Sequence, residues 1–242
     1  MNPRFFSVPS KQLATDAWLA RGDGSRGPRL AIVGLGMMGR EHLRVALLLG
    51  RVRIQGVYDE HPPSLEHAQR EYQALTQKPL AAYTSLDALC SDDNVDAYLI
   101  ATPNFTHSAI FERLMKTDKP IFLEKPMATS LTDAQRMVTM AKACPTFVQL
   151  GMQYRFKAQY VEAFHAIRVQ KALGTVRTVA MAEYRPPFLN KVGEWNKFNQ
   201  YSGGTLVEKC CHYFDLINLA VDAAPVKVYA QGGRAVNFLD FE

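Results

Sequence analysis

A glycine-rich turn near the start of the chain places the strongest constraint on its fold. Residues 30–33 form a short, continuous apolar run, as expected for a strand that is buried on both faces. Gly34, Gly36 and Gly39 follow in the pattern G-x-G-x-x-G, and residues 40–49 have the composition of a helix. A strand, a glycine turn and a helix in this order predict a nucleotide-binding unit.

The spacing of the glycines suits the binding of a pyrophosphate. The first glycine permits a tight turn, the second allows the backbone to approach the ligand, and the third lets helix and strand pack closely. The pyrophosphate then lies against unpaired N–H groups at the helix N-terminus. We therefore expect the cofactor-binding turn to consist of Gly34, Gly36, Met37, Met38 and Gly39.

An acidic residue stands where such a unit commonly binds a ribose. Residues 52–58 predict a second strand, which ends at Asp59, about 20 residues past Gly39. A carboxylate there can accept hydrogen bonds from the adenosine ribose. The alternative is that Asp59 is a turn residue ahead of the His-Pro-Pro segment. No arginine follows Asp59 directly to bind a 2′-phosphate, so the sequence favours NAD over NADP.

Strands and helices continue to alternate up to about residue 150. Helices are expected over residues 64–76 and 85–90 and up to residue 115, with Thr106 or Asn104 as the cap of the last. Strands are expected over residues 80–83, 97–101 and 121–123. This alternation predicts a doubly wound α/β fold with a parallel sheet, whose ligands collect at the carboxyl ends of the strands.

The second half carries less regular signals. A strand over residues 147–150, a helix over 159–171 and strands over 176–184 and 226–231 are expected, with a long polar and aromatic loop between the last two. We expect an extension at residues 1–28, a nucleotide-binding domain at 29–150 and a substrate domain at 151–242. Residues that could face a substrate are Tyr154, Arg155, Trp195 and Asn196, although packing is an equal alternative for Trp195.

The segment GGTLVEKCCHYFDL concentrates polar side chains. We expect one helix over residues 205–219, in which Glu208, His212 and Asp215 share a face while Lys209 and Cys210 point elsewhere. Metal binding, redox chemistry, plain packing and catalysis are the alternatives. No C-x-x-C or H-E-x-x-H motif accompanies the segment, and adjacent cysteines form only a strained disulfide. Catalysis is favoured, no metal is expected, and packing stays open.

Several motifs in order, VGLGMMG, ATPNFTH, LEKPMATS, YRF and GGTLVEKCCHYFDL, resemble those of the Gfo/Idh/MocA family of NAD(P)-dependent dehydrogenases. The resemblance runs from about residue 30 to the end of the chain. It implies a Rossmann domain followed by an α+β domain with a large, mostly antiparallel sheet. Members of the family usually exceed 300 residues, so we expect this second sheet to be incomplete, as in a fragment or a short gene product.

The resemblance also implies residues for the cofactor. Thr102, Pro103, Asn104 and His107 would line its groove, and Glu124 would lie with Lys125 beside the nicotinamide ribose. The alternative for His107 is a residue of the first helical turn that is hydrogen-bonded locally.

Catalytic roles follow from the same resemblance. Lys125 would be the catalytic lysine, beside a Lys-Pro bond that is typically cis, and would stabilise a developing alkoxide. His212 would face the substrate, where a histidine that titrates near neutrality can exchange the proton. Glu208 stands in place of a more frequent aspartate and is one methylene longer. The catalytic set is therefore Lys125, His212 and Glu208.

Together these features predict an NAD-dependent oxidoreductase that transfers a hydride between nicotinamide and a secondary alcohol or carbonyl of a sugar, cyclitol or related polyol. The alternative is a non-catalytic NAD(P)-binding regulator of the same fold. A net charge of +5 without basic runs argues against nucleic acid, and no apolar run is long enough for a membrane span. The four cysteines lack the density and spacing of a disulfide scaffold, and with no signal-type segment the sequence favours the cytoplasm. A homo-oligomer through the C-terminal sheet is possible.

Overall fold

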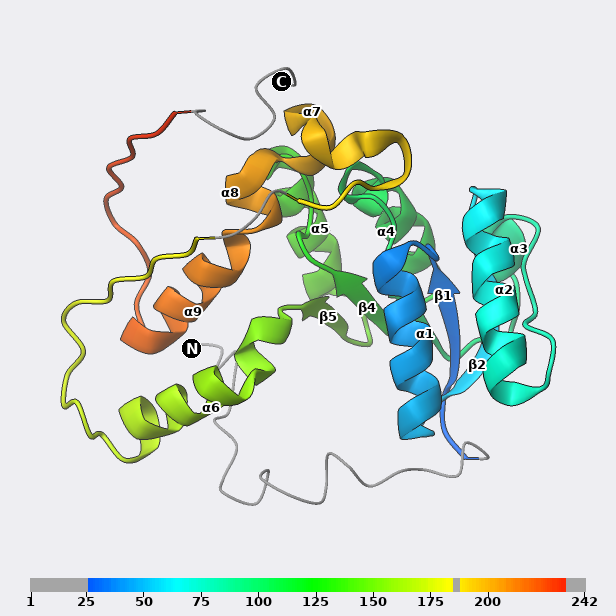
Figure 1. The fold of residues 1–242 in the computed structure, drawn as a ribbon, viewed down its shortest axis with the longest axis horizontal. Helices are drawn as coiled ribbons and strands as arrows, with labels where there is room; N and C mark the ends of the chain where they lie inside the picture. The colour runs from blue at the N-terminus through cyan, green and yellow to red at the C-terminus, as the bar shows by residue number, and fades with distance from the viewer. Residues whose placement is uncertain (1–25, 185–187, 234–242) are drawn as a thin grey trace.

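The first part of the chain folds into a parallel sheet with helices on both faces (Figure 1). This computed structural model describes residues 26–184 and 188–233. Within them five strands pair in the order β2-β1-β3-β4-β5. Their bounds are Arg29–Val33 (β1), Arg53–Tyr58 (β2), Ala97–Ile100 (β3), Ile121–Glu124 (β4) and Val148–Gly151 (β5).

Alternating side chains of the strands build two apolar cores, one on each face of the sheet. Ile32 of β1 packs in the core that includes Leu43 and Ala68, whereas its neighbour Val33 packs in the core that includes Phe111 and Met137. The helices that cover these two faces confirm the doubly wound fold. They are α1 (Met37–Leu49) and α2 (Pro62–Thr76) on one face, and α3 (Leu86–Cys90), α4 (His107–Met115) and α5 (Leu131–Ala143) on the other.

The helix ends follow local sequence in most cases. The Ser85 hydroxyl accepts a hydrogen bond from the Ala88 N–H group and caps α3, and Ser130 caps α5 in the same way. Thr106 occupies the N-cap position of α4, as one of the two expected caps, but its side chain makes no capping hydrogen bond, and Asn104 begins the preceding 3-10 turn η2 (Asn104–Thr106). The strand expected over residues 80–83 is reduced to one isolated bridge beside β2.

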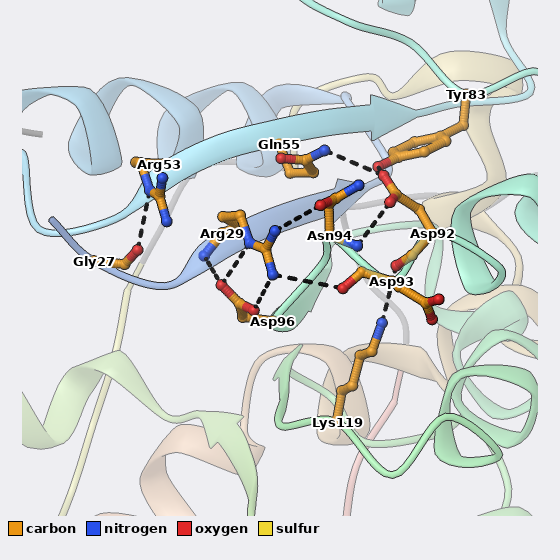
Figure 2. A network of polar contacts seen from close by, with 10 residues as sticks. All are labelled: Gly27, Arg29, Arg53, Gln55, Tyr83, Asp92, Asp93, Asn94, Asp96 and Lys119. Atoms are coloured by element: carbon orange, nitrogen blue, oxygen red, sulfur yellow. Dashed lines mark hydrogen bonds and ion pairs between the residues drawn. The ribbon is translucent and has the colours of Figure 1, made fainter. Parts of the chain in front are cut away.

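A polar network ties together the amino ends of β1 and β3 (Figure 2). The Arg29 guanidinium donates to both carboxylate oxygens of Asp96, at 3.0 and 2.8 Å, and the Arg29 backbone N–H donates to the same side chain at 2.7 Å. These hydrogen bonds hold the pKa of Asp96 well below its usual range.

Helices and loops make up the described second half. Its elements are η3 (Gln153–Phe156), α6 (Ala158–Phe164), the π-helical turn η4 (His165–Val169), η5 (Val192–Lys197), α7 (Asn199–Ser202), α8 (Gly204–Glu208) and α9 (Cys211–Val221). Phe164, Leu216 and Leu219 form a small buried cluster between α6 and α9. In Figure 1, α7 and α8 lie near the β4–α5 side of the sheet, and α6 and α9 extend away from it.

Two expectations for this half are wrong in the described residues. Residues 176–184 and 226–231 are not strands, because neither pairs its backbone with a neighbouring strand. An apolar, β-prone sequence forms a strand only where such a neighbour completes its hydrogen bonds. The single helix expected over residues 205–219 is divided into α8 and α9, with a break at Lys209 and Cys210.

Candidate active site

The glycine turn between β1 and α1 has the shape of a phosphate cradle. A Cβ atom on Gly39 would lie 1.9 Å from the Gly34 carbonyl oxygen, and one on Gly34 would lie 2.7 Å from the Ala101 backbone. A Cβ atom on Gly36 would meet nothing within 4 Å. The outer two glycines are therefore required for packing, whereas the middle one leaves open space in front of the first N–H groups of α1. This arrangement fits a dinucleotide.

Asp59 follows β2 and reaches back to the glycine turn. Its Oδ2 accepts the Leu35 N–H at 2.6 Å, and its Oδ1 accepts the His61 N–H at 2.7 Å. Asp59 thus has the turn role considered from the sequence, and it also braces the cradle. A carboxylate has about four lone-pair sites, so both oxygens can still accept ribose hydroxyls.

Glu124 and Lys125 lie at the carboxyl end of β4, at the same edge of the parallel sheet as the glycine turn. Glu124 is buried, and its Oε1 lies 2.7 Å from Nε2 of His42 on α1. Its Oε2 accepts the Lys125 N–H at 3.1 Å. The peptide bond between Lys125 and Pro126 is cis, as the family resemblance implied. His42 is a site neighbour that sequence reasoning missed, because nothing local marks its partner 82 positions away.

His107 is fully buried and bridges the loops after β3 and β4. Its Nδ1 lies 2.8 Å from the Pro126 carbonyl oxygen, and its Nε2 lies 3.0 Å from the Thr102 carbonyl oxygen. Burial lowers the pKa of the ring. With 0% of its surface exposed, His107 positions the two loops, and its contact with a cofactor stays a prediction.

Asn104 joins the sheet to the second half of the chain. Its side chain is buried and donates to the Ser202 carbonyl oxygen at 3.0 Å. Thr102 and Pro103 precede it and remain partly exposed at the end of β3. The structure therefore leaves Thr102 and Pro103 accessible at the crevice, whereas Asn104 serves at least as a tether.

The break between α8 and α9 corrects the expected directions of the side chains. Lys209 was expected to point away from the acidic and histidine face, yet it is 9% exposed and its Nζ donates to the Tyr154 hydroxyl. The same ammonium lies 3.4 Å from the Glu183 carboxylate. Lys209 and His212, three positions apart, thus both contact the Tyr154 ring. Lys209 is the second neighbour that the sequence did not reveal.

Glu208 connects three segments of the site. Its side chain is 3% exposed and its Oε1 lies 2.8 Å from the Lys191 ammonium, while its backbone oxygen accepts a hydrogen bond from Lys125 Nζ at 3.1 Å. Lys191 directly precedes η5, in the long loop, and is the third neighbour that sequence reasoning missed. Burial lowers the pKa of Lys125, and the nearby Glu208 carboxylate partly offsets this. The predicted pair of Lys125 and Glu208 is therefore brought together.

His212 lies at the start of α9, near Lys125, and is 2% exposed. Its imidazole stacks on the Tyr154 ring, and its buried Nδ1 has no hydrogen-bond partner within the described ranges. Burial, and then the charges of Lys125 and Lys209, lower the pKa of His212 to about 4. The ring is therefore neutral at pH 7 and has a nitrogen to offer to a ligand.

The remaining residues that were expected to face a substrate contact other residues of the chain. Arg155 binds Asp215 through Nε at 2.7 Å, which joins η3 to α9. Trp195 lies 4.2 Å below the Lys191 ammonium, and Asn196 donates to the Leu189 carbonyl oxygen at 3.0 Å. These three side chains shape the walls of the site, and their contact with a substrate stays a prediction.

The cysteines of the segment do not form a redox or metal centre. Burial raises the pKa of both Cys210 and Cys211, which keeps them as thiols at neutral pH. Among the residues that the structure describes, no group of three His, Cys, Asp or Glu side chains could hold a metal ion. In the same ranges, no helix is long and apolar enough to cross a membrane.

Comparison with known proteins gives the site a context. Residues 28–152 match a family model described as "Oxidoreductase family, NAD-binding Rossmann fold", and residues 168–238 match the companion model of its "C-terminal alpha/beta domain". The chain is 24% identical to myo-inositol 2-dehydrogenase of Thermotoga maritima, over 86% of this chain and 59% of the relative. It is 27% identical to 1-carboxy-3-chloro-3,4-dihydroxycyclo hexa-1,5-diene dehydrogenase of Comamonas testosteroni, over 85% of this chain and 50% of the relative.

Solved structures agree on the fold. The structure of GenD2 from gentamicin A biosynthesis, in complex with NAD, superposes with a TM-score of 0.68 at 22% identity, over 83% of this chain and 56% of that one. The chain spans about half the length of the curated relatives it matches, from 39% to 59%.

Proposed function

Because the chain belongs to the Gfo/Idh/MocA oxidoreductase family, with an NAD(P)-binding Rossmann fold, we propose that it acts as an NAD-dependent dehydrogenase on the CH–OH group of a cyclitol, sugar or related polyol. The observation that carries this proposal is the convergence of Lys125, Glu208 and His212 at the carboxyl end of the sheet, within the family's two matched domains. The names of the relatives, which include inositol dehydrogenases, support the substrate class.

The cofactor is assigned to the cradle between β1 and α1. The open space at Gly36 admits a pyrophosphate, and Asp59 accepts the ribose hydroxyls. NAD supplies the hydride acceptor when it is bound. Glu60 follows Asp59 directly, so two carboxylates would repel the 2′-phosphate of NADP, and we therefore propose NAD as the preferred cofactor.

Lys125, His212 and Glu208 each have a separate role in the proposed oxidation of an alcohol. Lys125 presents its ammonium to the substrate oxygen and stabilises the negative charge that develops there. His212 takes up the hydroxyl proton, because its low pKa keeps the imidazole neutral and its Nδ1 lacks a partner in the described residues. Glu208 holds the Lys125 ammonium through its backbone oxygen, so its assigned role is positioning.

Turnover on a panel of polyols, with NAD and with NADP, tests the proposal. We expect oxidation of at least one cyclitol or sugar by the wild type with NAD, and a fall in kcat of about 100-fold or more for both Lys125→Met and His212→Asn. Lys142→Met, an exposed lysine on α5, serves as the control and should retain full activity. Wild-type activity that survives Lys125→Met would contradict the mechanism.

The same measurements decide between an enzyme and a cofactor-binding regulator. Isothermal titration with NAD should show binding that is lost in Gly36→Ala. Saturable NAD binding without turnover on any polyol would favour the regulator, whereas turnover favours the dehydrogenase. A higher affinity for NADP than for NAD would contradict the role assigned to Asp59 and Glu60.

A further inference from the structure

Lys191 occupies a position in the site that its sequence context does not suggest. It directly precedes η5, between the two expected strands of the second half, and its ammonium reaches the buried carboxylate of Glu208 at 2.8 Å. The same ammonium lies 4.2 Å from the centre of the Trp195 ring. An ion pair and a cation–π contact together fix one ammonium in place more firmly than either contact alone.

The loop that carries Lys191 is itself anchored. The buried side chain of Asn196 donates to the Leu189 carbonyl oxygen across the loop, and Trp195 meets Phe105 of η2 edge to face, with centroids 6.4 Å apart. Phe105 directly follows Asn104 at the end of β3. Lys191 is therefore held from the cofactor side of the crevice as well as by Glu208.

Glu208 presents two different groups to two lysines. Its carboxylate binds Lys191, and its backbone oxygen binds Lys125 Nζ at 3.1 Å. The titratable groups that face Lys125 come from several elements: Glu124 on β4, His107 on α4, Lys191 just before η5, Glu208 on α8, and Cys211 and His212 on α9. Glu124 already contacts His42. The charge near Lys125 can therefore be changed by substitution of Lys191 or Glu208 without disturbing that contact.

We propose that Lys191 is a positioning residue that acts on Lys125 through Glu208. Its ion pair orients the Glu208 segment on which the Lys125 ammonium docks, and it cancels the negative charge next to that ammonium. The inference deepens the proposed function, since it concerns the lysine that polarises the substrate oxygen. Glu208 then serves to hold the two lysines, and His212 exchanges the substrate proton.

The consequence is that Lys191 controls how readily Lys125 gives up its proton. Removal of Lys191 leaves Glu208 as an uncompensated buried carboxylate, which favours the charged form of Lys125, and also removes a repelling ammonium. Both effects raise the pKa of Lys125. Removal of the Glu208 carboxylate has the opposite effect, because Lys125 then faces Lys191 without an intervening negative charge.

Amine labelling of Lys125 tests the effect of Lys191 on the pKa of Lys125 and requires no turnover. The inference and the proposed function can therefore fail independently. Brief acetylation with acetic anhydride across neutral to alkaline pH, quantified by mass spectrometry, reports the unprotonated fraction of Lys125, with the exposed Lys142 as internal standard. Near pH 8 we expect Lys191→Met to reduce labelling of Lys125 about threefold or more, and Glu208→Gln to increase it.

Matched variants separate charge from loop damage. Lys197→Met removes the other lysine ion pair of η5, to Glu194, and should leave the labelling curve of Lys125 unchanged. Lys191→Arg keeps the positive charge beside Glu208 and should therefore give the wild-type labelling curve. In a Glu208→Gln background, Lys191→Met should have a smaller effect than in the wild type. Equal curves for wild type and Lys191→Met, or equal shifts for Lys191→Met and Lys197→Met, would overturn the inference.

Discussion

The phenol ring of Tyr154 lies flat against the imidazole of His212, with the ring centroids 4.1 Å apart and the planes 6° from parallel. Tyr154 belongs to η3 and His212 to α9, so the stack joins two segments that are far apart in the sequence. The Tyr154 hydroxyl in turn accepts a hydrogen bond from Lys209. One aromatic ring thus orients the proposed proton acceptor and places a buried cation beside it.

Two substitutions at Tyr154 separate the stack from the hydroxyl. Tyr154→Phe keeps the aromatic face and loses only the hydrogen bond to Lys209, whereas Tyr154→Leu loses both. Because an aromatic pair contributes about 0.5–1.5 kcal/mol beyond burial, we expect kcat/KM for Tyr154→Leu to lie about twofold to tenfold below that of Tyr154→Phe. Steady-state kinetics on the best polyol substrate measure the ratio. Equal values for the two variants would show that the stack does not orient His212.

The pKa of His212 makes stability depend on pH in a defined direction. The His212 ring has a pKa of about 4 in the folded protein and an ordinary value of 6.5 in the unfolded chain. The unfolded state therefore binds more protons than the folded state between pH 4 and 6.5. The free energy of unfolding should therefore rise as the pH increases from about 4 to 6.5, and stay level above it with respect to this group. Buried His107 contributes in the same direction.

Urea unfolding of wild type and His212→Asn at several pH values measures this term. We expect the variant to show a shallower rise over the same interval, by on the order of 2–3 kcal/mol at most. The slope that remains would belong to His107 and to the carboxylates. A variant with the full wild-type slope would mean that the imidazole is not held neutral in the folded protein.

Substitution of two glycines of the cradle should have two different effects, one on stability and one on NAD affinity. Gly39→Ala would place a methyl group 1.9 Å from a backbone oxygen, so we expect a loss of about 3 kcal/mol or more and poor folding. Gly36→Ala meets no atom within 4 Å and should fold with nearly the wild-type Tm, but bind NAD at least about tenfold more weakly because the methyl group fills the ligand space. Thermal melts and NAD titrations check the two outcomes. Normal NAD affinity in Gly36→Ala would remove the pyrophosphate from this turn.

The Arg29–Asp96 pair should stabilise the sheet in a manner that acid removes. Hydrogen bonds from the Arg29 side chain and backbone lower the pKa of Asp96, so its contribution is present above the unfolded value of 3.8 and is lost as the pH falls through the folded value. We expect Asp96→Asn to be less stable than wild type at pH 7, with a difference that shrinks below about pH 3.8. Chemical unfolding at both pH values gives the comparison, and a difference that is independent of pH would contradict the assignment.

The cofactor half was predictable because its signals are local. A buried strand, the three glycines and Asp59 all lie within about 30 residues, which is one supersecondary unit. The apolar alternation along β1 and β3 then determines which helices cover which face. In contrast, the contact between His42 and Glu124 joins residues 82 positions apart and has no signature in either segment.

The site of the second half was predictable in composition but not in geometry. Glu208 and His212 were identified as candidates, yet the helix assumed to carry them breaks at Lys209, whose contacts with Tyr154 and Glu183 are made over long sequence separations. Helical periodicity cannot show such a break, because tertiary contacts outweigh local propensity. Lys191 was missed for the same reason, since a lysine in a polar loop usually lies in solvent.

Different forces stabilise each half of the chain, and this determines which part unfolds first. Within the described residues, the buried apolar cluster of the second half comprises Phe164, Leu216 and Leu219, while ion pairs such as Arg155–Asp215 and Lys191–Glu208 join its segments. Core strands and helices open last in local unfolding. Partial unfolding would then open the segments that carry Glu208 and His212 while the cradle keeps its fold, so we expect an inactive preparation still to bind a dinucleotide.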